Sequence, residues 1–135
     1  MTAEVRDHMF AHAMAELPNE ACGMFSVPCG VSLVDEFHPV ANIAASATLF
    51  ALDGKEMLDL ENRVESASRQ LVGVMHSHTK TDAYPSPTDV RDAGRFDPFG
   101  TFHHVIVSLQ GVEPVLRCFT ISGAEITEIP VEHCR

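Results

Sequence analysis

The sequence predicts a single α/β domain in which helices pack on one mixed β-sheet. The chain has 135 residues, a length typical of one domain, so residues 1–135 are expected to form a single domain. Three helical segments lie among strand-like runs over residues 1–95. The remaining residues form strand-like runs joined by short turns, which is typical of neighbouring antiparallel strands. Helices among strands, followed by hairpin-linked strands, indicate a mixed sheet with helices on its faces.

Turn-forming and capping residues divide the first half of the chain into five expected elements. Apolar side chains recur at helical spacing from residue 2 until Pro18, which cannot continue a helix. Gly30 marks the turn between the first two strands, and Asp53 is a favoured residue for starting a helix. The expected elements are a helix at 2–17, a strand at 21–27, a strand at 32–40, a short strand at 48–52 and a helix from 53 or 54 to about 70.

The second half of the chain begins with the apolar, β-branched run LVGVMHSH, which predicts a buried strand. Ser86 and Pro87 predict the start of a helix, because serine is favoured at the N-cap and proline at the first helical position. The elements expected here are a strand at 71–78, a loop at 79–85, a helix at 87–95 and strands at 103–109, 112–122 and 125–131.

Charge and composition exclude several classes of function. The chain has 19 acidic and nine basic residues, a formal charge of −10 that repels nucleic-acid phosphates. No apolar stretch approaches the ~20 residues of a membrane helix, and the N-terminus lacks the apolar core of a signal peptide. We therefore expect a cytoplasmic protein with four reduced cysteines, and neither nucleic acid nor a membrane as partner.

The residues most indicative of chemistry are His76 and His78, at the end of a predicted strand. Residues i and i+2 of a strand point to the same face, so the two imidazoles can converge on one metal ion. Asp89 follows in the first turn of the next helix, and Ser86 precedes that helix. Helix capping is a sufficient explanation for Ser86 and Asp89, but a carboxylate in that turn can also face a metal across the loop.

Two histidines and one carboxylate leave one coordination position open for water. This set is typical of a catalytic zinc site, whereas a structural zinc site uses four protein ligands. The same ligands can hold Fe(II), so residue types alone leave the metal open. The attacking water needs a base, and Glu20 at the start of the first strand is a candidate that only the fold can bring to His76.

Together these residues resemble the complete JAMM motif of the MPN/Mov34 metalloprotease family. The motif consists of Glu20, His-Ser-His at 76–78, seven intervening residues, Ser86 and Asp89, and the resemblance covers essentially the whole chain. It implies the JAMM/MPN fold, which is cytidine-deaminase-like, although the HxE and PCxxC motifs of a zinc deaminase are absent. It also implies one zinc ion per chain on the two histidines and Asp89, with Glu20 as general base and Ser86 as hydrogen-bond donor to the oxyanion.

The flanking sequence resembles one branch of that family. HSHTKTDAYPSPTDV at 76–90 and NEACG at 19–23 are similar to the small bacterial Mec-type hydrolases, which act on a cysteine-loaded, ubiquitin-like sulfur carrier of the CysO type. The resemblance implies cleavage of the amide between the carrier's C-terminal Gly-Gly and cysteine, for cysteine biosynthesis, and leaves a homodimer open. The alternatives are an isopeptidase for another ubiquitin-like conjugate, a non-hydrolytic iron enzyme and an inactive scaffold, which the intact motif disfavours.

The remaining polar candidates are interpreted as structural. His8 and His12 have the i, i+4 spacing of a metal-binding pair, but HMFAH lacks the glutamate of HExxH, so a solvated helix face is expected. His38 and the pair His103-His104 are expected at the core edge or surface, and Cys22 as a small buried hydrophobe.

Overall fold

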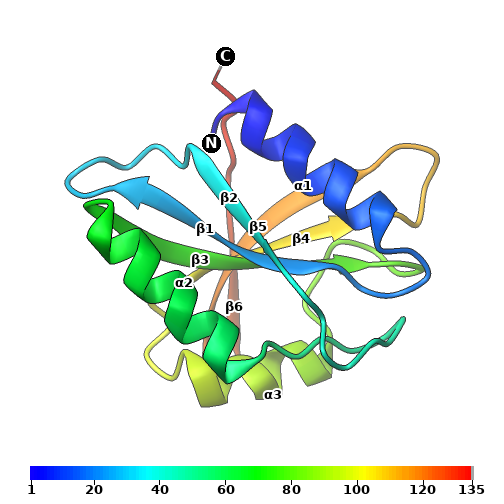
Figure 1. The fold of residues 1–135 in the computed structure, drawn as a ribbon. Helices are drawn as coiled ribbons and strands as arrows, with labels where there is room; N and C mark the ends of the chain where they lie inside the picture. The colour runs from blue at the N-terminus through cyan, green and yellow to red at the C-terminus, as the bar shows by residue number, and fades with distance from the viewer. Residues whose placement is uncertain (135) are drawn as a thin grey trace.

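A six-stranded mixed sheet forms the centre of the protein, in the strand order β2-β1-β3-β4-β5-β6 (Figure 1). The computed structural model describes residues 1–134. Strands β3 and β4 are parallel, and the other neighbouring pairs are antiparallel. The predicted α/β class with one mixed sheet is confirmed. In chain order the elements are α1 (Ala3–Ala15), β1 (Cys22–Pro28), β2 (Glu36–Val40), α2 (Gly54–Ser66), β3 (Arg69–His78), α3 (Pro87–Phe96), β4 (His103–Ser108), β5 (Val115–Ser122) and β6 (Glu125–Ile129).

The helices cover the two faces of the sheet, with α1 on one face and α2 and α3 on the other (Figure 1). Met75 of β3 belongs to the buried cluster that contains the apolar side of α1. Leu60 and Val64 of α2 pack with Met24 on the opposite face. Side chains alternate along a strand, so His76 and His78 lie on the face covered by α2 and α3.

Each helix begins with a side-chain cap, which explains why the predicted helix starts agree with the structure. The Thr2, Asp53 and Ser86 side chains each accept a hydrogen bond from the main-chain N–H three residues later. Among residues 1–134, no helix has the length and apolar character needed to cross a bilayer.

Several expected boundaries were too generous, and local backbone features account for them. Helix α2 ends at Ser66 rather than near residue 70, because Ser68 adopts a left-handed conformation with φ 57° and β3 begins directly after it. Strand β2 begins at Glu36 rather than at 32, where its pairing with Ser26 of β1 begins. Strand β5 begins after Pro114, which lacks the N–H that a sheet ladder needs.

The short strand expected at 48–52 was wrong, because a side chain satisfies the backbone of this segment. Asn42 accepts a hydrogen bond from the N–H of Ala51 at 3.0 Å and donates one to the carbonyl of Leu49 at 2.9 Å. An asparagine side chain that binds nearby backbone in this way competes with strand pairing. Residues 42–52 therefore form a loop, which lies against the predicted site.

Candidate metal centre

Three side chains converge on one point at the end of β3. His76 and His78 present their Nε2 atoms 3.1 Å apart, and Asp89 places Oδ2 3.1 Å from the first and 3.0 Å from the second. Both histidines are buried, at 3% and 5% exposure. Within residues 1–134, these three residues are the one group of at least three His, Cys, Asp or Glu side chains whose ligand atoms come together closely enough to hold a metal.

The position of Asp89 follows from the start of α3. Ser86 Oγ accepts a hydrogen bond from the Asp89 N–H at 3.1 Å, and the Ser86 N–H donates to Asp89 Oδ2 at 2.9 Å. This reciprocal capping box holds the same carboxylate oxygen that faces the two imidazoles. The capping and metal-ligand interpretations are therefore compatible, because one rigid turn serves both.

The donor set fits a divalent metal ion. An ion about 2.0–2.1 Å from each atom of a tetrahedral set separates those atoms by about 3.3 Å, close to the spacing observed here. His78 Nδ1 lies 2.7 Å from the carbonyl of Asp82, so a donated N–H there leaves the Nε2 lone pair facing the centre. Burial opposes ionisation of Asp89, but its close polar contacts with the two histidine rings hold the pKa of its carboxyl well below the usual range.

Glu20 reaches this centre through the pairing of β1 with β3. The Ala21 N–H donates to Ser77 Oγ at 2.8 Å, and the Ser77 N–H donates to the Ala21 carbonyl at 3.0 Å. Glu20 is only 4% exposed, and its Oε1 has no hydrogen-bond partner within the described residues. Burial raises the pKa of Glu20 to about 7, although nearby His78 partly opposes the rise. A buried carboxyl with a free oxygen next to a ligand set is suited to proton transfer.

A pocket of about 280 Å³ opens at this centre, and Glu20, His78 and Ser86 all contribute to its lining. The structure thus brings all five residues of the predicted motif together. The pocket is also lined by Ala47, Thr48, Thr79, Lys80, Thr81 and Thr88.

Two residues at the site had not been singled out from the sequence. Phe50 stacks on the ring of His76, with centroids 4.5 Å apart and planes 18° from parallel. Asn42 uses its full hydrogen-bonding capacity, since its amide donates to the carbonyls of Glu20 and Leu49 and accepts from two main-chain N–H groups. Both residues belong to the loop at 42–52, whose irregular backbone carries no periodic signal that could have identified them.

Two of the other histidines are more buried than expected, and each has a polar partner within the fold. His12 is not on a solvated face: its Nε2 lies 3.0 Å from the Cys22 carbonyl. His104 is buried and lies 3.1 Å from Asp97 Oδ2. Burial lowers the pKa of His104, so a neutral imidazole faces an ionised carboxylate.

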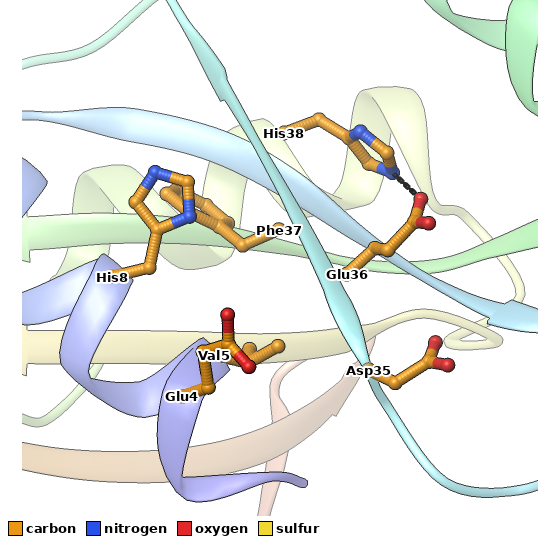
Figure 2. Close-up of a pocket in the computed structure, with 7 residues that line it drawn as sticks. All are labelled: Glu4, Val5, His8, Asp35, Glu36, Phe37 and His38. Atoms are coloured by element: carbon orange, nitrogen blue, oxygen red, sulfur yellow. Dashed lines mark ion pairs between the residues drawn. The ribbon is translucent and has the colours of Figure 1, made fainter.

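A second pocket, of about 220 Å³, lies between α1 and β2 (Figure 2). It contains two histidines and three carboxylates, but these do not converge on one point. His8 contacts Phe37 edge-on with ring centroids 5.1 Å apart, whereas His38 faces Glu36 at 3.7 Å (Figure 2). This pocket is therefore not a second metal centre of the kind formed by the end of β3.

Cys22 is buried on β1, as expected for a small hydrophobe, and the four cysteines are free thiols. Burial raises the pKa of the Cys22 thiol to about 12, which leaves it protonated and unreactive at neutral pH.

Fold and site together define a hydrolase of the JAB/MPN class, and the comparisons with known proteins agree. Residues 2–122 match Prok-JAB, the prokaryotic homologs of the JAB domain, and the chain belongs to this family. A crystal structure of a JAB1/MPN domain protein from Archaeoglobus fulgidus aligns with a TM-score of 0.63 at 19% identity, over 97% of this chain and 94% of that one. The predicted JAMM/MPN fold is confirmed.

Several relatives carry names that describe an activity. The CysO-cysteine peptidase of Mycobacterium tuberculosis is 37% identical over 130 residues, which are 96% of this chain and 86% of the relative. The probable TtuB-protein conjugate cleaving protease of Thermus thermophilus is 30% identical over 93 residues, which are 68% of this chain and 61% of the relative.

Proposed function

We propose that this protein is a zinc-dependent hydrolase that cleaves the amide bond between the C-terminal glycine of a ubiquitin-like sulfur-carrier protein and cysteine. The released cysteine would serve cysteine biosynthesis in the cytoplasm. The observation that carries this proposal is the convergence of His76, His78 and Asp89 beside the buried, unpartnered carboxyl of Glu20. The similarity to a CysO-cysteine peptidase over nearly the full chain supports the choice of substrate.

His76, His78 and Asp89 would hold one zinc ion per chain. When bound, the ion would supply Lewis acidity, which polarises the scissile carbonyl and lowers the pKa of the attacking water. The protein contributes the fixed orientation of the ligands. Asp82 orients the ring of His78, Phe50 stacks on His76, and the capping box of α3 holds Asp89.

Glu20 would act as the general base. Its carboxylate accepts a proton from water as the oxygen attacks the carbonyl carbon, and returns that proton to the amide nitrogen as the C–N bond breaks. A group that both takes and gives a proton works best with a pKa near the working pH, and burial raises the pKa of Glu20 to about 7. The products are the carrier with a free C-terminal carboxylate and cysteine with a free amine.

Ser86 would stabilise the negative charge that develops on the carbonyl oxygen. Its Oγ accepts a hydrogen bond from the Asp89 N–H, so its hydroxyl proton remains available for donation. Because the capping box fixes the side chain, this donor is already oriented before the reaction begins.

The direct test uses the CysO–cysteine adduct as the probe with the zinc-loaded protein, followed by mass spectrometry. We expect the adduct to lose the mass of one cysteine residue, and metal-free protein to leave it intact. Absence of cysteine release would overturn the proposal. The Thermus relative favours one second candidate, cleavage of a ubiquitin-like protein from a target protein, and a carrier joined to a protein lysine tests it in parallel.

A further inference from the structure

The pocket beside Glu20 has a composition suited to one small, polar leaving group. Its volume of about 280 Å³ is near the lower end of ligand pockets. Apart from Glu20, His78 and Ala47, its lining consists of hydroxyl-bearing residues and one basic residue, Lys80. Such a lining can accommodate a single amino acid and offers a positive charge to one of its groups.

The backbone on both sides of Lys80 is anchored. Thr79 Oγ1 donates to the carbonyl of Ala47 at 3.0 Å, and the Ser108 hydroxyl donates to the carbonyl of Thr81. Lys80 itself follows the ligand His78 by two residues, so its main chain has a defined position close to the centre. Because the backbone is fixed, binding of a ligand by Lys80 has to order the side chain alone, not the loop as well.

The ammonium group of Lys80 is available for a ligand. The side chain is exposed, and within residues 1–134 it forms none of the ion pairs that occupy the arginines Arg6, Arg69, Arg91 and Arg117. The protein as a whole carries a formal charge of −10, which repels a free carboxylate. A cation at the pocket therefore offsets part of this repulsion when an anionic group enters.

We propose that Lys80 binds the free α-carboxylate of the leaving amino acid and so makes this site selective for a single amino acid over a protein. The inference rests on the proposed function. In the cysteine adduct the α-carboxylate lies two bonds from the scissile nitrogen, whereas a lysine side chain of a target protein carries no carboxylate near that nitrogen. Lys80 thus distinguishes the two candidate reactions by charge.

The experiment compares two probes, CysO–cysteine and CysO–cysteinamide, which differ only in the charge of the α-carboxyl group. For the zinc-loaded wild-type protein we expect kcat/KM to be about fivefold to tenfold lower with the amide, a range typical of a partly exposed charge contact. The loss falls mainly on KM, because the carboxylate is bound equally in the ground state and the transition state.

Substitutions complete the test. Lys80→Met lowers kcat/KM for the cysteine adduct by the same factor and leaves the amide probe unchanged, while Lys80→Arg retains most of the activity. Lys55→Met is the matched control, because Lys55 is the other lysine of the chain, is exposed on α2 and lies outside the pocket lining. Lys55→Met removes the same charge and should leave kcat/KM unchanged for both probes.

Binding to the metal-free protein gives a readout that does not depend on turnover. Calorimetric titration is expected to show weaker binding of the amide probe, and Lys80→Met is expected to abolish that difference. Equal kcat/KM for the two probes would overturn the inference and leave the proposed function standing. Release of neither cysteine from the first probe nor cysteinamide from the second would overturn both.

Discussion

The side-chain amide of Asn42 donates a hydrogen bond to the main-chain carbonyl of Glu20 at 3.0 Å. The main-chain N–H of Glu20 donates in turn to the carbonyl of Ser46 at 2.7 Å. The loop at 42–52 therefore holds both backbone groups of the proposed base. Since β1 begins only at Cys22, this loop rather than the sheet ladder holds the main chain at Glu20.

Asn42→Ala should lower kcat while leaving zinc bound, because Asn42 contacts no proposed ligand and the loop loses four hydrogen bonds. We expect about a tenfold loss of kcat and about 1–3 kcal/mol lower unfolding free energy. Asn42→Asp keeps the two accepted hydrogen bonds and loses the donated ones, so it removes the contact with Glu20 together with only one other, to the carbonyl of Leu49. Kinetics, elemental analysis and chemical denaturation check these outcomes. Full activity in both variants would show that the base is positioned without Asn42.

Purified protein should contain about one zinc ion per chain, and chelation should remove both zinc and activity. His76→Ala/His78→Ala should abolish binding, because two of three ligands are lost. His8→Ala/His12→Ala is the matched control, since this helical pair lies on α1 and should leave the zinc content unchanged. Elemental analysis measures the identity and amount of the bound metal, and iron in place of zinc would favour the non-hydrolytic alternative.

Glu20→Gln should preserve the fold and the zinc content, because the two side chains are nearly isosteric and Glu20 is not a proposed ligand. Turnover should fall by ~10²–10⁴-fold, the usual contribution of a positioned base. Steady-state rates on the cysteine adduct, with zinc content and thermal unfolding measured on the same sample, provide the check. Near-normal turnover would exclude Glu20 as the base.

Ser86→Ala should have two separable effects. Loss of the N-cap should lower the unfolding free energy by about 1 kcal/mol. Loss of the oxyanion donor should lower kcat by ~10²-fold or more. Thr2→Ala removes the equivalent cap from α1, on the other face of the sheet, and should reproduce only the loss of stability. If Ser86→Ala also changed stability alone, the serine would be a cap and nothing more.

The buried pair of His104 and Asp97 should contribute stability that is lost as the pH falls below about 6.5, opposite in sign to the contribution of Glu20, whose pKa is raised. Burial lowers the pKa of His104 from 6.5, so the unfolded chain takes up a proton there before the folded one does. Hydrogen bonds from His104 and Thr101 outweigh burial and lower the pKa of Asp97 from 3.8, so its contribution is lost at still lower pH. Between pH 7 and 5 the unfolding free energy of His104→Gln should fall less with decreasing pH than that of the wild-type protein in denaturation experiments, and an identical slope in the two proteins would show that His104 does not contribute.

The local chemistry of the site could be anticipated from short stretches of sequence. His76 and His78 share a face because side chains alternate along a strand. Ser86 and Pro87 predict the start of a helix whose first turn contains Asp89. These relationships span a few residues, where backbone geometry leaves little freedom. The resemblance to the JAMM motif added Glu20, which local reasoning could name only as a candidate.

The loop at 42–52 shows where such reasoning fails. Its apolar end suggested a strand, but the side chain of Asn42 satisfies backbone groups that a strand would pair. His104 was expected at the core edge or surface, where a strand opens, yet it is buried, and Asp97 at the end of α3 compensates this burial with a hydrogen bond. In both cases the deciding partner is a side chain, whose hydrogen bonds carry no periodic pattern.

The sequence by itself determined the α/β class, the starts of the three helices and the pairing of two histidines with a capped aspartate, because propensity, alternation and capping act over a few residues. Only the tertiary structure decided that Glu20 lies beside the two histidines and Asp89. The antiparallel register of β1 and β3 places Cys22 opposite His76 and so carries Glu20 to the ligands from 56 positions away in the chain. The carboxyl is buried there, and burial raises its pKa, a property that depends on the surrounding atoms rather than on the residue type.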